Sequence, residues 1–251
     1  MFQKNKKTIL IFIAVLFLAV FVFAIIFIFQ KPETVKATDY SETFYSSASD
    51  GYIYKTGTNY TTVHNSATGT VSAAISVFRI GQKGTSYGVY RAFVFFDTSS
   101  IPSNATIISA TLSLYGSTDF SDTDFDIIIR NGQPTYPHYP LATGDYYYAN
   151  CSGDGGTFNT SSFSVSGYND ISLNADGLSW IQKGDGALTK LALTSSRDVS
   201  ATTPTGNEMV DVKSYESAGY QPKLVVNYTV SSGNSTHVTS GVKIGNGIIV
   251  K

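Results

Sequence analysis

Residues 90–115 read YRAFVFFDTSSIPSNATIISATLSLY, and this stretch decides the fold class. The run Ala92–Phe96 is apolar at every position, which is typical of a central strand that is buried on both faces. After a turn signal at Pro102–Asn104, apolar residues alternate with polar ones, and the apolar set is Ile108, Ala110, Leu112 and Leu114. Alternation with a period of two predicts a half-buried strand with one wet face. The stretch therefore predicts two strands joined by a short loop.

Three further segments show the same alternation, namely Phe125–Ile129, Thr189–Leu193 and Lys223–Val230. One short helix is expected between Asn174, a residue type that caps helices, and Gly184, a residue type that ends them. The sequence thus contains many short strands, one helix and no repeated strand–helix–strand unit. This pattern predicts an all-β fold, an antiparallel β-sandwich. We expect the last of these strands to close the sheet beside its first strand.

An apolar run from Ile9 to Phe29 contains no charge, proline or glycine. A helix of this length spans about 30 Å, the thickness of the hydrocarbon core of a bilayer. Lysines before the run and mixed charges after it predict that residues 1–8 stay in the cytoplasm. We therefore expect a transmembrane signal anchor, a stalk at 30–45 and a single-pass protein at the cell surface. The alternative is a signal peptide cleaved near Ala37, which releases a secreted protein.

The extracellular part divides into a domain at 46–230 and a tail at 231–251. In the tail, a polar linker precedes two short apolar segments, Val242–Ile244 and Ile248–Val250, around a glycine-rich turn. A hairpin of this size is marginal in water by itself. We expect it to pack on the domain, to pair with another chain by strand addition, or to fray. Self-association through the tail is thus one predicted partner interaction.

Charge and cysteine content exclude several classes of protein. Charged residues make up 14% of the chain, and the formal net charge is −1. Nucleic-acid binding needs a basic surface, so no nucleic-acid partner is expected. Cys151 is the single cysteine, which rules out an intrachain disulfide, and we interpret it as a small residue in a loop. His64, His138 and His237, assigned to loops or the tail, have no nucleophile signature beside them, so no enzymatic activity is expected.

Six Asn-x-Ser/Thr sequences offer N-glycosylation acceptors if the protein is exported. They are Asn59, Asn104, Asn150, Asn159, Asn227 and Asn234. A chain rich in serine, threonine and asparagine produces many such sequences by chance. They are therefore compatible with a glycoprotein, and they do not distinguish one from an unmodified chain.

Three segments together resemble the DNRLRE family, also called disaggregatase-related. The first is Tyr90–Asp97 followed by Ile101–Tyr115, which is similar to the family's arginine, aromatic strand and Ile-Pro to Leu-Tyr pattern. The second runs from Tyr168 to Ile181 and is similar to the family's Asp-Val-Thr to Val-x-x-Trp segment. The third, from Ser214 to Tyr228, resembles the closing pattern, and Asp50 stands where the family has its opening aspartate.

The resemblance covers about residues 46–230 and implies a jelly-roll-like β-sandwich used as an accessory module on secreted or cell-surface proteins. It also implies a carbohydrate partner, because some members bind polysaccharides, including acidic ones. In place of the family's Trp-rich segment this chain has a tyrosine-rich loop, whose candidate ligand-binding residues are Tyr136, Tyr139, Tyr146, Tyr147 and Tyr148. Tyrosine offers a sugar an apolar ring and a hydroxyl group. The alternative is that these tyrosine rings simply cover the surface of the sandwich. Trp180, the single tryptophan, is expected in the core.

No cofactor is required by this interpretation, but acidic residues offer two Ca²⁺ candidates, since Ca²⁺ prefers carboxylate and carbonyl oxygens. One candidate pairs Asp50 with Glu216 at the rim of the sandwich, and its alternative is an ion pair of Glu216 with Arg91. The other candidate uses Asp122 and Asp124. Its alternative is a solvated face that protects an edge strand.

The sequence thus predicts a membrane-anchored, non-catalytic extracellular module for adhesion or polysaccharide binding. A structural subunit of a surface layer, filament or coat is the alternative, favoured by the low charge and the tail hairpin. An enzyme that hydrolyses glycosides would need two carboxylates that face one cleft.

Overall fold

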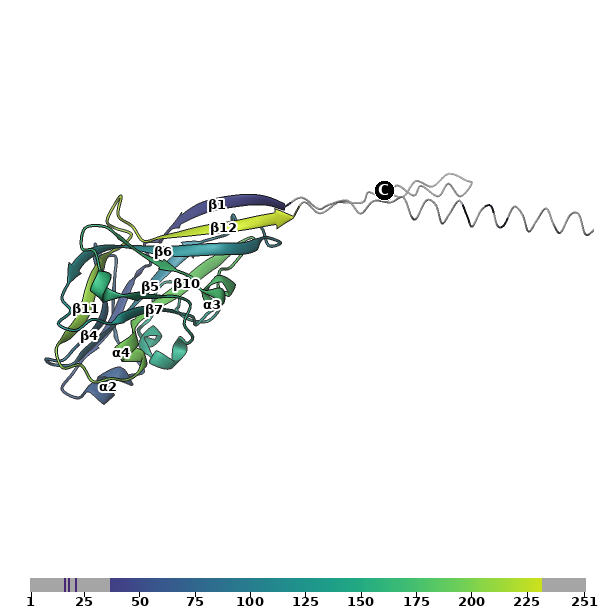
Figure 1. Ribbon diagram of the computed structural model, residues 1–251. Helices are drawn as coiled ribbons and strands as arrows, with labels where there is room; N and C mark the ends of the chain where they lie inside the picture. Colours follow the sequence, from purple (N-terminus) through teal and green to yellow (C-terminus); the bar gives the residue numbers. More distant parts are fainter. Residues whose placement is uncertain (1–15, 17, 19–20, 22–36, 232–251) are drawn as a thin grey trace, which may run out of the picture. The chain divides into compact units, whose positions relative to one another are not determined.

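Twelve β-strands form the framework of the described chain, residues 16, 18, 21 and 37–231 of a computed structural model (Figure 1). Residues Ala37–Ser231 form one compact unit. None of the helices in the described residues has the length and hydropathy of a membrane span. Apart from three residues, the predicted anchor at 9–29 lies outside the described part, as do the predicted cytoplasmic segment and the tail hairpin.

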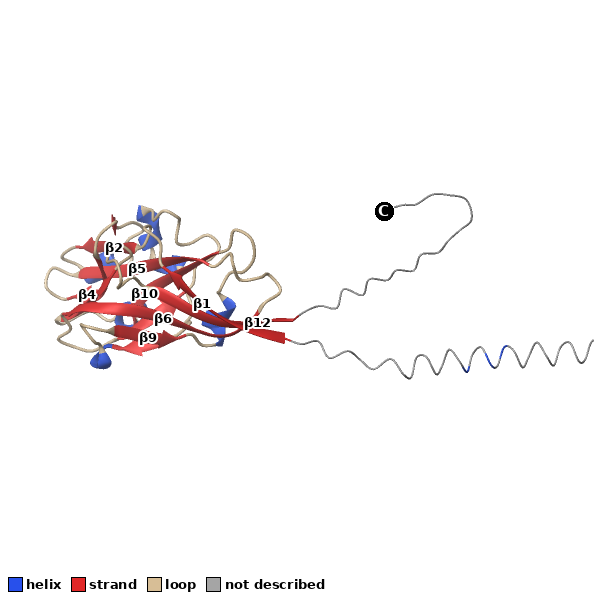
Figure 2. Ribbon diagram, turned by 90° about the horizontal axis from the view of Figure 1, so that it is seen from above, coloured by secondary structure: helices blue, strands red, loops and turns tan. Residues whose placement is uncertain are grey.

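The first layer of the sandwich contains four antiparallel strands, which Figure 2 labels. Their order is β1 (Ala37–Tyr45), β12 (Lys223–Ser231), β6 (Thr106–Asp119) and β9 (Tyr168–Ser172). β12 lies between β1 and β6, so the closing strand does lie beside the first one. The predicted stalk is wrong for residues 37–45, because these residues pair with β12 along its whole length.

The second layer contains the central strands of the domain. Their order is β11 (Asn207–Lys213), β4 (Val77–Lys83), β5 (Gly88–Asp97), β10 (Leu188–Ser195), β7 (Asp126–Arg130) and β8 (Thr157–Asn159). β2 (Gly51–Thr56) also pairs with β5 and carries β3 (Thr70–Ala73). Every residue of β5 before Asp97 is buried, which confirms the prediction of a central strand.

β6 belongs to both layers. Its first part pairs with β12 and β9, and its end, from Gly116 to Asp119, pairs with β11 in the second layer. Gly116 lies where the strand crosses, and a Cβ there would come within 1.9 Å of the carbonyl oxygen of Ser164. The close backbone approach therefore requires glycine at this position.

The main hydrophobic core lies between the two layers. It contains Ala110, Leu112 and Leu114 from β6 together with Val94 and Phe96 from β5, each at most 3% exposed. Burial of a side chain the size of leucine or phenylalanine contributes about 1.5–3 kcal/mol. The alternating apolar residues therefore do fill the core of an all-β sandwich, as predicted.

The alternation in β6 fails at one predicted core position. Ile108 is 56% exposed. The pairing with β12 skips it, because Asn227 lies opposite Ser109 and Tyr228 lies opposite Ile107. This β-bulge reverses the side-chain directions before it, so Ile107 packs on the core in place of Ile108.

Helices are short but more numerous than the single one predicted. The described residues contain α2 (Tyr60–His64), α3 (Ala175–Ser179), α4 (Ser196–Val199) and the 3₁₀-helices η1 (Thr143–Tyr146), η2 (Tyr148–Asn150) and η3 (Thr160–Ser162). Segments of three to five residues are too short to show a helical period in the sequence. α4 follows β10 directly and η3 follows β8 directly, whereas the other four follow loops. Figure 1 labels α2, α3 and α4.

α3 is the predicted helix, and Asn174 caps it by accepting a hydrogen bond from the amide of Gly177 at 3.0 Å. It ends at Ser179 and does not reach Gly184. The chain turns towards β10, where the amide of Gln182 donates to Thr189 Oγ1 at 3.0 Å. Trp180 follows the helix, is partly buried and packs against the main core, in line with its predicted role.

A second apolar cluster covers the outer face of the second layer. Its buried members are Ile53, Tyr60, Val63, Val89, Phe93, Phe95, Tyr146, Cys151 and Ala192. They come from the strands β2, β5 and β10, from α2 and η1, and, for Cys151, from the loop after η2. β5 is therefore buried on both faces, and the polar residues beside this cluster are shielded from water.

Candidate functional site

The outer face of β5, β7 and β10, beside the second apolar cluster, holds the candidate site. Strand alternation decides which side chains reach it. Ile129 and Leu193 lie in the main core, whereas their neighbours Arg130 and Thr194 line a cavity on the outer face. Arg91 of β5 lines the same cavity. Polar side chains from three strands thus meet at one place.

Arg91 forms a buried two-point ion pair with Asp198 of α4. Its Nε donates to Oδ2 at 2.7 Å and its Nη2 donates to Oδ1 at 2.8 Å. The guanidinium also donates to the carbonyl oxygens of Tyr146 and, at 3.1 Å, of His64. It therefore joins β5 to α2, η1 and α4. The predicted alternative pairing of Arg91 with Glu216 is wrong, because Asp198 occupies this guanidinium.

His64 completes the cluster, with its Nδ1 2.8 Å from Asp198 Oδ1. Burial alone would raise the pKa of Asp198, but the charge of Arg91 and the hydrogen bonds from Arg91 and His64 lower it to about 2. The ionised carboxylate can only accept, so Nδ1 of His64 carries the proton. The prediction of His64 in a loop is wrong, since it is buried in α2.

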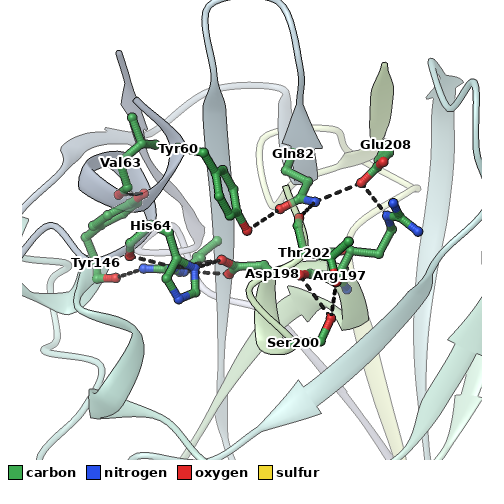
Figure 3. Close-up of polar contacts among 12 residues, drawn as sticks. Tyr60, Val63, His64, Gln82, Tyr146, Arg197, Asp198, Ser200, Thr202 and Glu208 are labelled. Atoms are coloured by element: carbon green, nitrogen blue, oxygen red, sulfur yellow. Dashed lines mark hydrogen bonds and ion pairs between the residues drawn. The ribbon is translucent and has the colours of Figure 1, made fainter. Parts of the chain in front are cut away.

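A polar network continues from this ion pair (Figure 3). Tyr60 donates to Gln82 Oε1 at 3.0 Å, and Gln82 Nε2 donates to Glu208 Oε2 at 2.8 Å. Arg197 Nε donates to the same carboxylate oxygen at 2.6 Å. These bonds join α2, β4 and β11 to α4. They therefore hold in place the helix that carries Asp198.

The cavity has a volume of about 20 Å³, enough for one water-sized group. Two atoms of its wall, Arg130 Nε and Thr194 Oγ1, are buried and have no hydrogen-bond partner among the described residues. An unpaired buried polar group costs about 1–3 kcal/mol, so both atoms call for an explanation. Cys151, also in the wall, is no nucleophile, because burial raises the pKa of its thiol to about 12.

Two of the five predicted ligand-binding tyrosines, Tyr147 and Tyr148, line the cavity. Their exposed fractions are 38% and 42%. The ring of Tyr148 stacks on His64 with centroids 5.0 Å apart, and Tyr147 meets Tyr148 edge-on at 5.2 Å. Both rings therefore stand at the opening of a polar cavity.

The other three predicted tyrosines are placed differently. Tyr146 is completely buried, its hydroxyl donates to the carbonyl of Val63 at 2.8 Å, and its ring packs against the guanidinium of Arg91. Its burial makes it a core residue, which corrects its prediction as a binding residue. Tyr136 is partly buried, and Tyr139 is exposed and packs on a ring of the second cluster. Neither belongs to the cavity wall.

The predicted Ca²⁺ ligands fall into separate places. Asp50 is buried, and its Oδ2 accepts from Ser46 and from the amide of Tyr215, while exposed Glu216 lies close enough to raise its pKa further. Asp122 accepts from the amide of Asn207 at 2.8 Å, and Asp124 accepts from Thr160 at 3.2 Å. Among the described residues no three His, Cys, Asp or Glu side chains are grouped to hold a metal ion.

Five of the six predicted glycosylation acceptors lie in the described residues. Asn59, Asn104, Asn159 and Asn227 are exposed, whereas Asn150 is partly buried and donates to the carbonyl of Gly144. Asn234 lies outside the described part. Asn59 also caps α2 by accepting from the amide of Thr62 at 3.0 Å. Asn104 is exposed and alone among these five has no side-chain hydrogen bond within the described residues, so it is the acceptor at which a glycan would disturb the fewest hydrogen bonds.

Sequence reasoning missed Asp198, Arg130 and Thr194. Arg91 gave a usable signal, because a charge inside an apolar central strand needs a buried carboxylate as partner. The choice of Asp198 depends on the turn from β10 into α4, which no local pattern indicates. Arg130 carried a signal too, as the polar end of an alternating strand.

Comparison with protein-family models and with curated proteins found no match. Among solved structures, the chain is similar to one in the cryo-EM structure of mud crab tombus-like virus. The two share 7% sequence identity with a TM-score of 0.31, and the match covers 81% of this chain and 84% of the other. We draw no functional argument from a likeness of this size. The class of protein therefore follows from the described structure itself, which is an all-β sandwich.

Proposed function

We propose that the chain is a non-catalytic, jelly-roll-like module of the cell surface that binds polysaccharide on the outer face of its second layer. The observation that supports this proposal is the pair Tyr147 and Tyr148, two partly exposed rings at the opening of a polar cavity. Binding sites for small ligands commonly combine aromatic surface with a few convergent polar groups. A pyranose stacked on either ring would bring its substituents next to those groups.

Tyr148 is suited to this role because its position is fixed before a ligand arrives. Its ring stacks on His64, which is held in turn by the buried carboxylate of Asp198. A side chain that is already ordered loses little conformational entropy on binding. The buried ion cluster thus serves the proposed site as its rigid base.

The same proposal includes three parts of the sequence prediction. Residues 9–29 anchor the chain in the membrane, the domain is related to the DNRLRE family, and Ca²⁺ assists binding at Asp50 and Glu216. The proximity of these two carboxyl groups supports the third part. Each part has its own test, and none of them is needed for the sugar to stack on Tyr148.

A glycan array probed with the full-length chain, with and without Ca²⁺, tests the proposal. We expect binding of at least one polysaccharide class, and loss of about tenfold in affinity for Tyr148→Ala, the size expected for an aromatic anchor. Tyr215→Ala is the matched control, because Tyr215 is also 42% exposed and lies away from the cavity. Absence of binding under both conditions, or equal loss in both variants, would contradict the proposal.

A structural subunit is the second candidate function, and the edge of the first layer favours it. β1 is the last strand of its layer, and within residues 37–231 only β12 pairs along its length. Tyr40 on β1 and Ile108 on β6, on either side of β12, are 45% and 56% exposed and line one surface groove. A long exposed edge strand is a template for strand addition from another chain.

Sedimentation velocity of the full-length chain over a wide concentration range tests this second candidate. We expect association that the variant Thr38→Lys/Thr43→Lys prevents, because lysines along an edge strand oppose pairing. A chain lacking residues 232–251 separates the contribution of the tail from that of β1. A monomer at every concentration would exclude the candidate.

A further inference from the structure

We propose that β1 is the docking site for the C-terminal tail of a second copy of this chain, and that residues 242–250 of that copy add a strand to its free edge. The inference rests on the second candidate function, the structural subunit, and names the segment that makes its contact. It follows from the exposure of β1, from the charges of the two segments and from the place where the chain leaves the sandwich.

β1 has little of the domain around it. Seven of its nine residues are exposed, and only Phe44 is buried. The pairing of β12 with β6 ends at Thr229, whereas its pairing with β1 continues to Ser231. The end of β1 and β12 is therefore a two-stranded ribbon, which is marginal in water by itself. A further strand on the free edge of β1 would stabilise this ribbon.

The edge of β1 lacks several features that prevent strand addition. The strand contains no lysine or proline, and its register with β12 runs from Ala37 to Tyr45 without a bulge. Tyr40 faces the same way as the buried Phe44, but it is 45% exposed. Alternate residues of an added strand would lie beside this ring. β1 therefore offers a partner strand both free backbone groups and apolar surface.

Charge favours the tail as the occupant of this edge. β1 carries Asp39 and Glu42 and no basic residue. Residues 232–251 carry Lys243 and Lys251 and no acidic residue. Asp39 is exposed and lines the groove of the first layer. Opposite charges on neighbouring strands stabilise their pairing, whereas like charges oppose it. The tail is therefore a better partner for β1 than a second β1, which would bring four carboxylates together.

The sequence of the tail suits a strand that docks at a distance. Val242–Ile244 and Ile248–Val250 consist of β-branched residues apart from one lysine, and such residues favour strands. Both segments lie outside the described residues. The ten residues before them, 232–241, reach at most about 35 Å when extended, about the diameter of a small domain. The tail is therefore long enough to reach a neighbouring copy.

The place where the chain leaves the sandwich distinguishes a second copy from the chain's own tail. Ala37 lies opposite Ser231, so the chain enters β1 and leaves β12 at the same end of the sheet. A tail that returned to its own β1 would have to cross the segment that enters β1. Connections at one edge of a sheet do not cross each other. The tail of a second copy avoids this crossing.

A mixture of two variants, each unable to associate by itself, tests the inference. The full-length variant Thr38→Lys/Thr43→Lys keeps the tail and has a blocked edge. The chain lacking residues 232–251 keeps the edge and has no tail. Sedimentation velocity in one detergent compares them with the parent. We expect the parent to self-associate, each variant alone to stay monomeric, and their equimolar mixture to form a one-to-one complex.

Charge variants assign the contact to residues. Lys243→Glu/Lys251→Glu should weaken association of the parent about tenfold, because two favourable cross-strand charges become unfavourable. Addition of Asp39→Lys to the same chain should restore part of this loss. Lys55→Glu/Lys213→Glu is the matched control, since it makes the same change of net charge on β2 and β11 of the second layer. An equal loss in the control would overturn the inference.

A synthetic peptide makes the test independent of how well the β1 variant folds. The peptide has the sequence of residues 241–251 and is titrated into the chain lacking residues 232–251, with fluorescence anisotropy as the readout. We expect saturable binding of this peptide and no binding of a scrambled peptide at the same concentration. Equal binding of the two peptides would overturn the inference.

The outcomes separate the inference from the second candidate function. Association of the shortened chain as strong as that of the parent, together with loss of association in Thr38→Lys/Thr43→Lys, would overturn the tail as partner and keep β1 as a contact edge. A monomeric parent whose shortened form binds the peptide would assign the tail to its own β1 and overturn the second copy. A monomeric parent without peptide binding would overturn both proposals.

Discussion

Arg91 Nε lies 2.7 Å from Asp198 Oδ2, and this buried ion pair fastens α4 to the central strand β5. The two side chains are 3% and 4% exposed. The same cluster positions His64, on which Tyr148 stacks. The stability of the outer face and the geometry of the proposed binding site therefore both depend on the ion pair between Arg91 and Asp198.

Removal of one partner of this pair should destabilise the domain strongly. Asp198→Asn leaves the Arg91 charge buried without a counter-ion, and we expect a loss of about 3–5 kcal/mol in the free energy of unfolding. Denaturation in urea measures it. Asp185→Asn, at an exposed position, is the control and should change stability little. A loss below about 1 kcal/mol for Asp198→Asn would contradict the assigned ion pair.

Asp50 should make the domain less stable as the pH rises. Burial raises the pKa of its carboxyl from 3.8 to about 7, despite hydrogen bonds from Ser46 and Tyr215 that lower it. Below pH 4 the Asp50 carboxyl is protonated in both the folded and the unfolded chain, so it does not lower the free energy of unfolding. Between pH 4 and pH 7 only the unfolded chain gives up this proton, which reduces the free energy of unfolding by about 4 kcal/mol.

Unfolding measured from pH 4 to pH 8 checks this dependence. Asp50→Asn keeps an oxygen to accept from Ser46 and Tyr215 and cannot ionise, so it should flatten the curve in this window. Asp198 acts in the opposite sense and at lower pH, because its lowered pKa makes its contribution fall only below about pH 4. A parent chain whose stability rises between pH 4 and pH 7, with the same rise in Asp50→Asn, would contradict the prediction.

Neighbouring tyrosines should respond differently to substitution. Tyr146→Ala removes a completely buried ring and should cost about 3–5 kcal/mol in the free energy of unfolding. Tyr148→Ala removes a ring that is 42% exposed and should cost about 1 kcal/mol or less. Thermal unfolding of the two variants tests the division into a core and a ligand-binding tyrosine. Equal losses would show that Tyr148 is also a core residue.

Cys151 should be unreactive in the folded protein. It is 8% exposed, and burial raises the pKa of its thiol to about 12, so almost no thiolate forms at pH 8. We expect no modification by an aromatic disulfide reagent until guanidinium unfolds the chain, and then one thiol per chain. Rapid modification of the folded protein would show that the cysteine is accessible and would contradict its burial.

Much of the fold could be predicted because strand periodicity is local. Leu112 and Leu114 lie in the core where alternation puts them, and Ala92 to Phe96 form a strand buried on both faces. Ile108 could not be placed, because the bulge that turns it outward depends on the register with β12. The sequence predicts a stalk at 37–45 instead of a strand, because the pairing partner of these residues lies at the far end of the sequence.

The candidate site was harder to predict, because its residues meet only through the tertiary fold. The tyrosine-rich loop was recognisable from composition, but which ring is buried and which exposed depends on packing against α2. His64 and Asp198 are 134 residues apart, and each stands in a one-turn helix without a period. The unpaired state of Arg130 becomes visible only once the partners of the other arginines are known.

The most direct test of the account is NMR of the full-length chain with ring-labelled tyrosine, titrated with an oligosaccharide of the class that the glycan array identifies. Substitution of Tyr147 and Tyr148 one at a time assigns their ring signals. We predict that these two rings shift on binding and that Tyr215 does not. Shifts confined to Tyr40 and Tyr228, in the groove of the first layer, or no shift at a saturating concentration, would contradict a glycan site on the outer face of the second layer.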